Sequence, residues 1–411
     1  MSSEWGYAKL GELTVNLDTR RKPVKEADRK PGPYPYYGAS GIVDYVDGFL
    51  FDGDHLLIAE DGENLRTRQT PVAFMANGKF WVNNHAHVVV GNERASTRYL
   101  QYALLGSDIS SYLTGAVMPK LTQGNLNRIE VPCPSREIQE QIVSVLGGLD
   151  DRITLLRETN TTLEAIAQAL FKSWFVDFDP VRAKMEGRTP DGMDEATAAL
   201  FPDSFEESEL GLVPKGWRVC AFTETVNVIG GGTPKTSVSE YWDGSIPWFS
   251  VVDAPVTTDV FAIDTQKHIT EAGIANSSTK LLPAGTTIIS ARGTVGKLAM
   301  AGCEMAMNQS CYGLRGKAGD DYFTYFSTFR LVETLKQRTH GSVFDTITRD
   351  TLAGVIVTYP EQRIIKAFES LLAPVMRRIR TNLQQAQTLA TLRDTLLPRL
   401  ISGQLRLPEA A

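Results

Sequence analysis

The chain has 411 residues, of which 42% are hydrophobic and 22% are charged, ordinary values for a globular protein of two or three domains. No apolar run approaches the roughly 20 residues of a membrane span, and the first residues lack the apolar core of a signal peptide. The four cysteines form no C-x-x-C pair, so we expect buried thiols in a reducing cytoplasm and no disulfide framework.

The net charge of −6 argues at first against a polyanionic partner. However, residues 184–209 hold eight acidic side chains against Lys184 and Arg188, which alone gives a net charge of −6. The rest of the chain is about neutral, so its local basic clusters decide what it binds. These clusters are Arg20-Arg21-Lys22 with Lys25, Arg29 and Lys30, then Arg66 with Arg68, and Arg377-Arg378 with Arg380.

Both halves of the chain begin with patterns typical of short strands separated by turns. Residues 55–59 form an apolar run before the turn Glu60-Asp61-Gly62. Residues 286–290 form a similar run before Arg292-Gly293-Thr294. Such runs bounded by turn residues favour mixed α/β domains, which we place at residues 1–133 and 209–359.

A long helical pattern follows each of these domains, with apolar residues alternately four and three positions apart. This spacing continues from Ile138 to Leu170 and again from Ile364 to Leu396. It predicts helices near residues 136–175 and 361–401 that pair as a coiled coil, each spanning roughly 55 Å. Polar residues that we expect to fix the register of this seam are Arg152 and Arg378, then Thr159 and Gln385. An ordinary amphipathic pair within one core is the alternative.

Residues 115–175 recur without a gap 226 positions later, as residues 341–401. Gly115-Ala116-Val117 corresponds to Gly341-Ser342-Val343, for example. Weaker correspondences relate residues 34–38 to 246–250 and residues 82–85 to 307–310. A period this long indicates a duplicated domain. The predicted order is a domain, a helix (134–178), an acidic connector (179–208), a second domain and a second helix (360–411).

No catalytic or cofactor motif is convincing. The stretch Gly230-Gly231-Gly232-Thr233-Pro234-Lys235 has the glycines and lysine of a phosphate loop at the wrong spacing. No G-x-G-x-x-G follows a strand, and no G-x-S-x-G elbow is present. His85 and His87 can share a strand face, but no further ligand completes a metal set. We therefore expect no catalytic residue, metal or cofactor in this chain.

What remains is chemistry suited to recognising DNA. Amide side chains make bidentate contacts to adenine, arginines contact guanine or phosphate, and aromatic rings can contact thymine methyl groups. The competing interpretation is core packing for the aromatic residues and a solvated surface for the basic ones. The candidate DNA-binding residues are Arg20, Arg21, Tyr37, Arg66, Arg68, Asn83, Asn84, His85 and Lys120 in the first half, and Lys235, Trp248, Arg292, Thr294, Asn308, Gln309 and Arg349 in the second.

Several segments resemble the DNA-specificity subunit of Type I restriction–modification systems. Residues 170–184 (LFKSWFVDFDPVRAK) look like the end of that family's central conserved region. Residues 208–217 (SELGLVPKGW) look like the entry to its second recognition domain, and residues 393–403 (RDTLLPRLISG) like its C-terminal conserved region. The segments Gly231–Pro234, Arg292–Thr294 and Asn308–Ser310 also match a common type of second target domain.

The resemblance implies two target-recognition domains held apart by two antiparallel helices, each domain binding one half of a split DNA site. It also implies two modification subunits, which bind adenosylmethionine and methylate adenine. Restriction subunits would add translocation and cleavage driven by ATP with magnesium. Two other hypotheses stay open: a self-sufficient DNA methyltransferase or nuclease with a cryptic site, and a coiled-coil adaptor that binds two copies of a protein.

Overall fold

The computed structural model describes residues 4–255, 259–338 and 346–407. The chain divides into two compact units, and both boundaries fall within long helices: unit 1 is Met1–Ile153 with Thr388–Ala411, and unit 2 is Thr154–Gln387. The predicted second copy of the repeat begins at residues 341–345, which lie outside the described residues. Among the described residues no helix is long and apolar enough to cross a membrane.

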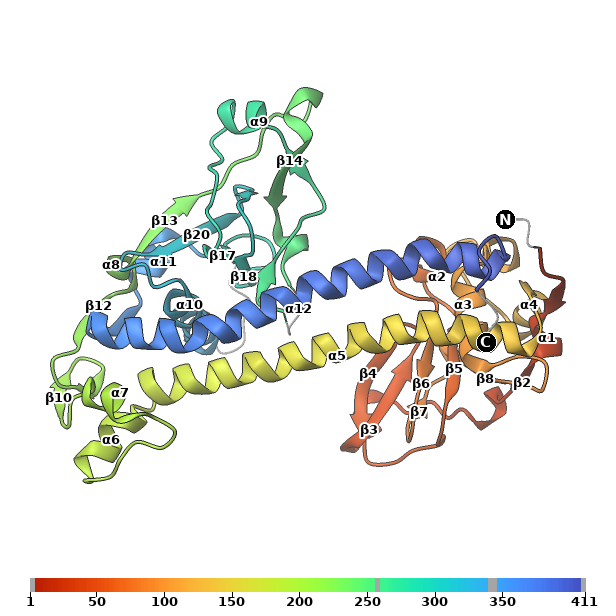
Figure 1. Cartoon of the computed structure of the whole chain (residues 1–411), viewed down its shortest axis with the longest axis horizontal. Coiled ribbons are helices and arrows are strands. Elements are labelled where there is room, and N and C mark those ends of the chain that lie inside the picture. The colour runs from red at the N-terminus through yellow and green to blue at the C-terminus, as the bar shows by residue number, and fades with distance from the viewer. Residues whose placement is uncertain (1–3, 256–258, 339–345, 408–411) are drawn as a thin grey trace. The chain divides into compact units, whose positions relative to one another are not determined.

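Unit 1 contains three small sheets and several short helices (Figure 1). Its strands are β1 (Tyr7–Lys9), β2 (Thr14–Asn16), β3 (Pro31–Gly38), β4 (Gly41–Val46), β5 (His55–Ala59), β6 (Ala73–Ala76), β7 (Trp81–Val82), β8 (Ala86–Gly91) and β9 (Glu130–Pro132). Its helices are α1 (Leu10–Leu13), η1 (Asp18–Arg20), η2 (Glu26–Asp28), α2 (Asn64–Thr67), α3 (Thr97–Leu105), η3 (Ser110–Tyr112), α4 (Gln123–Arg128) and the first part of α5 (Arg136–Phe175).

Unit 2 holds the second part of α5 and the remaining elements, except for the last part of the final helix, which belongs to unit 1. Its strands are β10 (Phe205–Ser208), β11 (Gly211–Pro214), β12 (Arg218–Ala221), β13 (Val226–Gly230), β14 (Trp242–Phe249), β15 (Phe261–Ala262), β16 (His268–Ile269), β17 (Thr287–Ser290), β18 (Leu298–Ala301), β19 (Ala306–Met307), β20 (Cys311–Gly316) and β21 (Ile356–Tyr359). Its helices are α6 (Asp179–Met185), α7 (Glu195–Ala199), α8 (Phe222–Thr225), η4 (Ser239–Tyr241), η5 (Val251–Asp253), α9 (Glu271–Ala275), α10 (Asp321–Arg338), α11 (Arg349–Ala353) and most of α12 (Gln362–Ser402).

The two units repeat one topology, which confirms the predicted duplication. The strand order β2-β8-β5-β6 in unit 1 corresponds to β13-β20-β17-β18 in unit 2, where β15 is added at the edge. The order β4-β3-β7 corresponds to β16-β14-β19, and the pair β1-β9 to β12-β21. The fold is therefore α+β, as the sequence predicts, and the duplication extends into the domains where the sequences match only loosely.

The local signals for these elements are the expected ones. All five residues of β5 and all four of β17 are buried, in agreement with the two apolar runs predicted as strands. The hydroxyl of Thr122 caps α4 by accepting from the amide of Asn125. Thr348, 226 positions later, caps α11 by accepting from the amide of Thr351. Two equivalent caps thus start two equivalent short helices ahead of the long ones.

Helices α5 and α12 match the predicted ranges of 136–175 and 361–401 to within a residue or two. In unit 2 the two helices run antiparallel (Figure 1), because Asn160 contacts Asn382 while Phe171, further along α5, contacts Phe368, nearer the start of α12. In unit 1, Arg393 of α12 donates to Asp150 of α5 over 2.7 Å. Ile142, Leu146 and Leu400 join the core of unit 1, while Ala167, Leu372 and Ile379 join that of unit 2.

The predicted polar positions of this seam are wrong by one residue. Arg152, Arg378 and Gln385 are exposed and Thr159 is half-buried, whereas their neighbours Ile153, Ile379, Ala386 and Asn160 are buried. The polar pair that does lie in the seam is Asn160 with Asn382, which are 1% and 0% exposed. Asn382 Nδ2 donates to Asn160 Oδ1 over 2.9 Å, and Asn160 Nδ2 donates to the carbonyl of Ile379 over 3.1 Å.

The acidic stretch predicted as a connector is folded. It contains α6, α7 and β10, and β10 pairs with β11 directly after the stretch. Val181 and Phe201 are buried in the unit 2 core, where Phe201 meets Trp174 of α5 edge to face at 5.2 Å. Its acidic side chains stay at the surface, as Glu206 and Glu207 illustrate. This stretch therefore closes the aromatic core at the end of α5.

Candidate nucleic-acid interface

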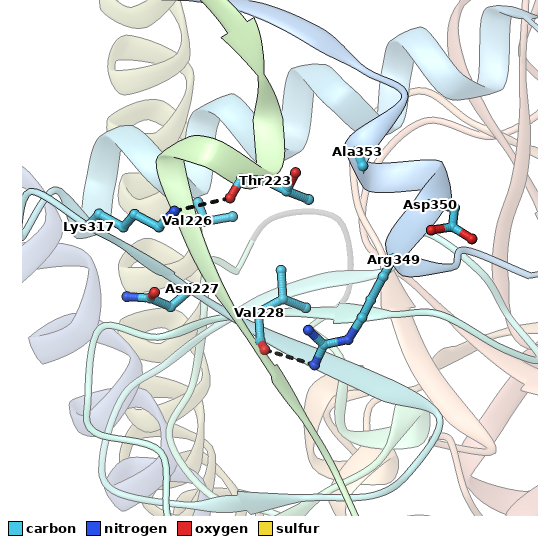
Figure 2. Close-up of a pocket in the computed structure, with 8 residues that line it drawn as sticks. All are labelled: Thr223, Val226, Asn227, Val228, Lys317, Arg349, Asp350 and Ala353. Carbon is cyan, nitrogen blue, oxygen red and sulfur yellow. Dashed lines mark hydrogen bonds between the residues drawn. The ribbon is translucent and has the colours of Figure 1, made fainter.

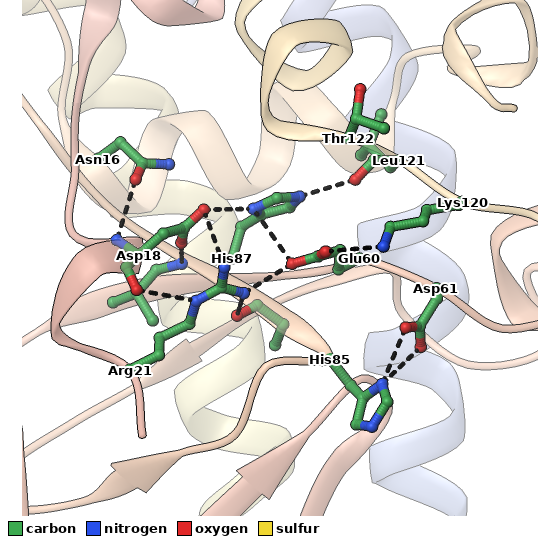
Figure 3. A network of polar contacts seen from close by, with 12 residues as sticks. Asn16, Asp18, Arg21, Glu60, Asp61, His85, His87, Lys120, Leu121 and Thr122 are labelled. Carbon is green, nitrogen blue, oxygen red and sulfur yellow. Dashed lines mark hydrogen bonds and ion pairs between the residues drawn. The ribbon is translucent and has the colours of Figure 1, made fainter. Parts of the chain in front are cut away.

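In unit 1 three chain segments meet at the turn that follows β5. The amide of Glu60 donates to the carbonyl of His85 over 2.9 Å, and the amide of Leu121 donates to the carbonyl of Glu60 over 2.8 Å. Asp61 pairs with Lys120 through an isolated antiparallel bridge. The side chain of Asp61 accepts from His85 Nδ1 at 2.8 Å, and Lys120 Nζ lies 3.4 Å from Glu60 (Figure 3). Backbone contacts thus fix the places of Asp61, His85 and Lys120.

A tight turn presents the predicted amide pair. Asn83 is largely buried, and its backbone amide donates to the carbonyl of Tyr37. Its side-chain Oδ1 accepts from the backbone amide of His85 at 2.8 Å. Because its side chain closes the turn, Asn83 has a structural role there. Its neighbours Asn84 and His85 are exposed. The turn therefore directs Asn84 and His85, and not Asn83, towards solvent.

Behind this turn lies a buried network of charges (Figure 3). Arg21 Nη1 donates to Glu60 at 2.7 Å and to the carbonyl of Ala86 at 2.8 Å, and its Nη2 lies 3.4 Å from Asp18. His87, 1% exposed, points its Nδ1 at Asp18 (2.6 Å) and its Nε2 at the carbonyl of Leu121 (2.8 Å). Arg21 is therefore engaged within the protein, where it supports the turn from behind.

Both ring nitrogens of His87 face oxygen atoms, so Asp18 and the carbonyl of Leu121 hold the ring from its two sides. Burial raises the pKa of Asp18. Hydrogen bonds from His87 and from the amide of Val88 lower it, as do electrostatic interactions with His87 and Arg21. Together these outweigh burial, so the pKa of Asp18 lies below its usual value. His85 and His87 point to different carboxylates, Asp61 and Asp18, so these two rings do not share a site.

Arg66 anchors a neighbouring loop. Its Nη2 donates to the carbonyls of Gly115 (2.8 Å) and Ala116 (3.3 Å). Thr114 and Lys120 close the loop through two backbone hydrogen bonds. Gly115 has φ +88°, and a Cβ there would lie 2.1 Å from the carbonyl oxygen of Met118, so only glycine fits. The loop that carries Lys120 is therefore held in one shape.

The other unit 1 candidates are partly engaged. Arg20 donates to the carbonyl of Leu50 and lies over the ring of Phe51 at 4.9 Å. Arg68 has a left-handed backbone (φ 49°) and donates to the carbonyl of Ser107 at 2.7 Å. Tyr37 packs edge to face on Phe80, and burial raises its pKa. Of these three, Arg20 and Arg68 remain exposed at the surface.

Unit 2 has the corresponding turn after β17. Arg292 pairs with Thr346 through an isolated antiparallel bridge, and the amide of Ala291 donates to the carbonyl of Ser310 at 2.7 Å. Arg292 and Thr294 are exposed. Among the described residues, no hydrogen bond or ion pair joins the Arg292 guanidinium to another side chain or carbonyl. Asn308 closes a tight turn by accepting from the amide of Ser310 at 3.0 Å, and exposed Gln309 accepts from the hydroxyl of Thr233.

The remaining unit 2 candidates lie apart from this turn or in the core. Trp248 is 6% exposed, with its indole N–H bonded to the carbonyl of Gly232 at 3.0 Å, so it is a core residue. Lys235 is exposed, and its carbonyl accepts from Trp242. Arg349 lines a polar pocket with Lys317 and Asp350, where it donates to the carbonyl of Val228 at 3.0 Å (Figure 2).

The structure thus brings His85 and Lys120 together in unit 1. It also assigns internal roles to Arg21, Asn83 and Trp248. The sequence treated Asp61 only as part of a turn, although it stands beside His85 and Lys120. The detectable signal was the turn after an apolar strand, which occurs once in each half of the chain.

Comparison with known proteins agrees with this geometry. Residues 2–165 and 214–385 match the model of a family described as the Type I restriction modification DNA specificity domain. The chain is similar to the Type I restriction enzyme HindI specificity subunit of Haemophilus influenzae, at 26% identity over 86% of this chain and 84% of the relative. It is also similar to the MjaIX specificity subunit of Methanocaldococcus jannaschii, at 25% identity over 99% of this chain and 94% of the relative.

A solved structure shares the fold. The crystal structure of the Type-I restriction-modification system S subunit from M. genitalium aligns with a TM-score of 0.59 at 15% identity, covering 100% of this chain and 97% of that one. The family match covers most of the chain in two copies, one in each half. The chain therefore belongs to the Type I restriction–modification DNA specificity family, as its sequence motifs indicate.

Proposed function

We propose that this chain recognises a bipartite DNA site for a Type I restriction–modification complex, with one half of the site bound by each unit. The supporting observation is the strand-end turn. Units 1 and 2 hold it with the same backbone hydrogen bonds but present different exposed side chains, which suits two domains that bind different base sequences. Specific contacts would come from these turns, and salt-dependent affinity from the phosphate contacts of the surrounding cations.

The chain is proposed to be a recognition and scaffolding subunit without a catalytic site of its own. The names of its relatives, specificity subunits of restriction enzymes, imply that other subunits carry out the chemistry. Adenosylmethionine, ATP and magnesium would accordingly be bound by the modification and restriction subunits. We place the complex in the cytoplasm, and the four free cysteines fit a reducing compartment.

The long helices are proposed to dock two equivalent modification subunits. Ile166 and Leu392 occupy equivalent positions of the repeat, and they are 46% and 45% exposed. Both belong to the predicted apolar spacing, yet neither lies in the seam between the helices. An exposed apolar residue repeated at the same place on both helices suits two copies of one partner.

The deciding experiment is to purify the chain with its modification subunits and to map the methylated adenines in DNA exposed to the complex. The expected result is methylation within one bipartite sequence that requires both this chain and the modification subunits. Methylation or cleavage by this chain alone would instead indicate a self-sufficient enzyme. Sequence-independent methylation, or no retention of DNA by the complex, would favour the adaptor hypothesis.

A further inference from the structure

The turns after β5 in unit 1 and after β17 in unit 2 are held by equivalent backbone hydrogen bonds. In unit 1 the amide of Asn83 bonds the carbonyl of Tyr37, and in unit 2 the amide of Asn308 bonds the carbonyl of Phe249. The amide after β5 bonds the carbonyl of His85, and the amide after β17 bonds that of Ser310. The amides of Leu121 and Ile347, which are 226 positions apart, bond the carbonyls of Glu60 and Ala291.

This correspondence identifies equivalent side-chain positions independently of sequence similarity. Asp61 bridges Lys120, and Arg292 bridges Thr346, the residue 226 positions after Lys120. Asp61 and Arg292 therefore occupy the same place in their units, directly followed by glycines with positive φ, +110° at Gly62 and +76° at Gly293. The backbone is the same at this place, but the charge of the side chain is reversed.

A reversed charge at one position of a DNA-binding surface constrains what each side chain can contact. A carboxylate is repelled by phosphates, so it is tolerated at a DNA surface only where a hydrogen-bond donor meets it. In the major groove such donors are the exocyclic amino groups of cytosine and adenine. A guanidinium at the same position matches the O6 and N7 acceptors of guanine.

Resting on the proposed function, we propose that Asp61 and Arg292 are the equivalent specificity-determining residues of the two units. Asp61 accepts a hydrogen bond from the exocyclic amino group of a cytosine or adenine in one half-site. Arg292 donates two to a guanine in the other. Asp61 is preset by His85, whose Nδ1 lies 2.8 Å from its carboxylate (Figure 3), and its carboxylate keeps free lone pairs for a base.

The neighbouring side chains suit this assignment. Lys120 and His85, which flank Asp61, have side chains 50% and 52% exposed. Arg66 holds the loop that carries Lys120. Lys120 and Arg66 place positive charge beside the carboxylates of this turn, which lie on Glu60, Asp61 and Glu63, and this reduces the repulsion between the turn and the DNA phosphates.

The test uses the complete methyltransferase complex carrying Asp61→Asn, Asp61→Ser or Arg292→Ala, with base preference at each position of the methylated site as the readout. Each Asp61 variant should relax or change the preference at one position of one half-site, by roughly tenfold or more. Arg292→Ala should relax a guanine position in the other half-site. Asp52→Asn, an exposed carboxylate ahead of the same strand β5, is the matched control and should leave all preferences unchanged.

The outcomes separate the two proposals. If the Asp61 variants lower methylation uniformly, with base preferences unchanged, Asp61 is only a structural residue and the inference is overturned. If Arg292→Ala leaves all base preferences unchanged, the assignment of Arg292 is overturned. This variant tests the proposal even if the Asp61 variants fail to fold. If the wild-type complex methylates no bipartite site, the proposed function itself fails.

Discussion

Glu369 on α12 carries a half-buried carboxyl group whose surroundings disfavour its charged form. Its Oε1 accepts from the amide of Phe323, near the start of α10, at 2.7 Å. Burial raises its pKa from about 4.5 to about 7, and the nearby charges of Asp321 and Asp320 add to this, although backbone hydrogen bonds oppose it. Because the folded pKa is raised, the stabilisation from the protonated form is complete below pH 4.5 and is lost as the pH rises through 7.

Replacing Glu369 with glutamine should therefore stabilise the protein in neutral and alkaline solution. The glutamine side chain would keep the acceptor for the Phe323 amide without the buried charge. We expect the free energy of unfolding at about pH 8 to rise by on the order of 2 kcal/mol, and the gain to shrink towards about pH 5. Urea denaturation at both pH values measures this. Glu361→Gln, at an exposed pair with Arg363, is the control, and an equal gain at both pH values would contradict the assignment.

Asp18 illustrates the opposite case. Its lowered pKa means that its contribution to stability is present above the pKa of the unfolded chain and is lost as the pH falls through the folded value. Asp18→Asn should lower the free energy of unfolding by about 3 kcal/mol at about pH 7, because it removes the carboxylate that His87 and the largely buried Arg21 guanidinium contact. Thermal unfolding from about pH 4 down to about pH 2 should show the difference narrowing, whereas it should stay constant between about pH 5 and about pH 7. Asp28→Asn, at an exposed position, should have no effect.

Neighbouring residues in this network show why the site could be predicted only in part. Arg20 and Arg21 are indistinguishable in a basic cluster, yet Arg21 is half-buried and bonded to a partner 39 positions away, Glu60, while Arg20 stays exposed. Turn positions could be predicted because strand ends and glycines are local features. Which side chain faces inward depends on tertiary partners that local patterns do not contain.

At the scale of elements, the lengths of α5 and α12 follow from the sequence but their contact faces do not. Two 4-3 patterns that are offset by one residue have every second position in common. Counting apolar residues therefore cannot decide which of the two patterns faces the other helix. The buried track includes Asn160 and Ala167, which contribute little to an apolar pattern, while Ile166 and Leu392 strengthen the wrong track from exposed positions. Exposed apolar residues on the outer face of a helix therefore mask the register of its inner face.

The Asn160–Asn382 pair gives a direct test of the observed register. In the duplicated arrangement its counterpart is Leu156 with Ala386, so the polar pair occurs on one side only. Asn160→Leu should destabilise unit 2 by about 2 kcal/mol, because Asn382 is left buried without its partner. Adding Asn382→Leu should recover at least half of this loss, giving a coupling above about 1 kcal/mol in a double-mutant cycle.

The predicted but incorrect seam positions provide the control for this cycle. Thr159 and Gln385 do not lie in the seam, so Thr159→Leu and Gln385→Leu should act independently, with a coupling below about 0.5 kcal/mol. Chemical denaturation of the full chain measures all six variants and combinations. Strong coupling between Thr159 and Gln385, with none between Asn160 and Asn382, would restore the register predicted from the sequence.

At the scale of the whole molecule, both helices pass from one unit into the other, at Ile153 in α5 and at Gln387 in α12. If each unit binds one half-site, the length of the helices sets the gap between the half-sites. Inserting seven residues after Ile153 and after Gln387 adds about 10 Å to each helix and preserves the heptad phase. The methylated site should then carry a gap longer by about three base pairs, since base pairs rise about 3.4 Å along DNA.

Mapping methylated adenines with the extended complex measures that gap directly, while the two half-site sequences should be unchanged. Seven residues inserted at exposed Gly192, in the folded acidic stretch outside both helices, form the matched control and should leave the gap as it was. If the extended complex still methylates sites with the original gap, the helices do not act as a spacer. Because base preference would still be carried by the turns after β5 and β17, that result would remove the spacer role alone and leave the recognition role intact.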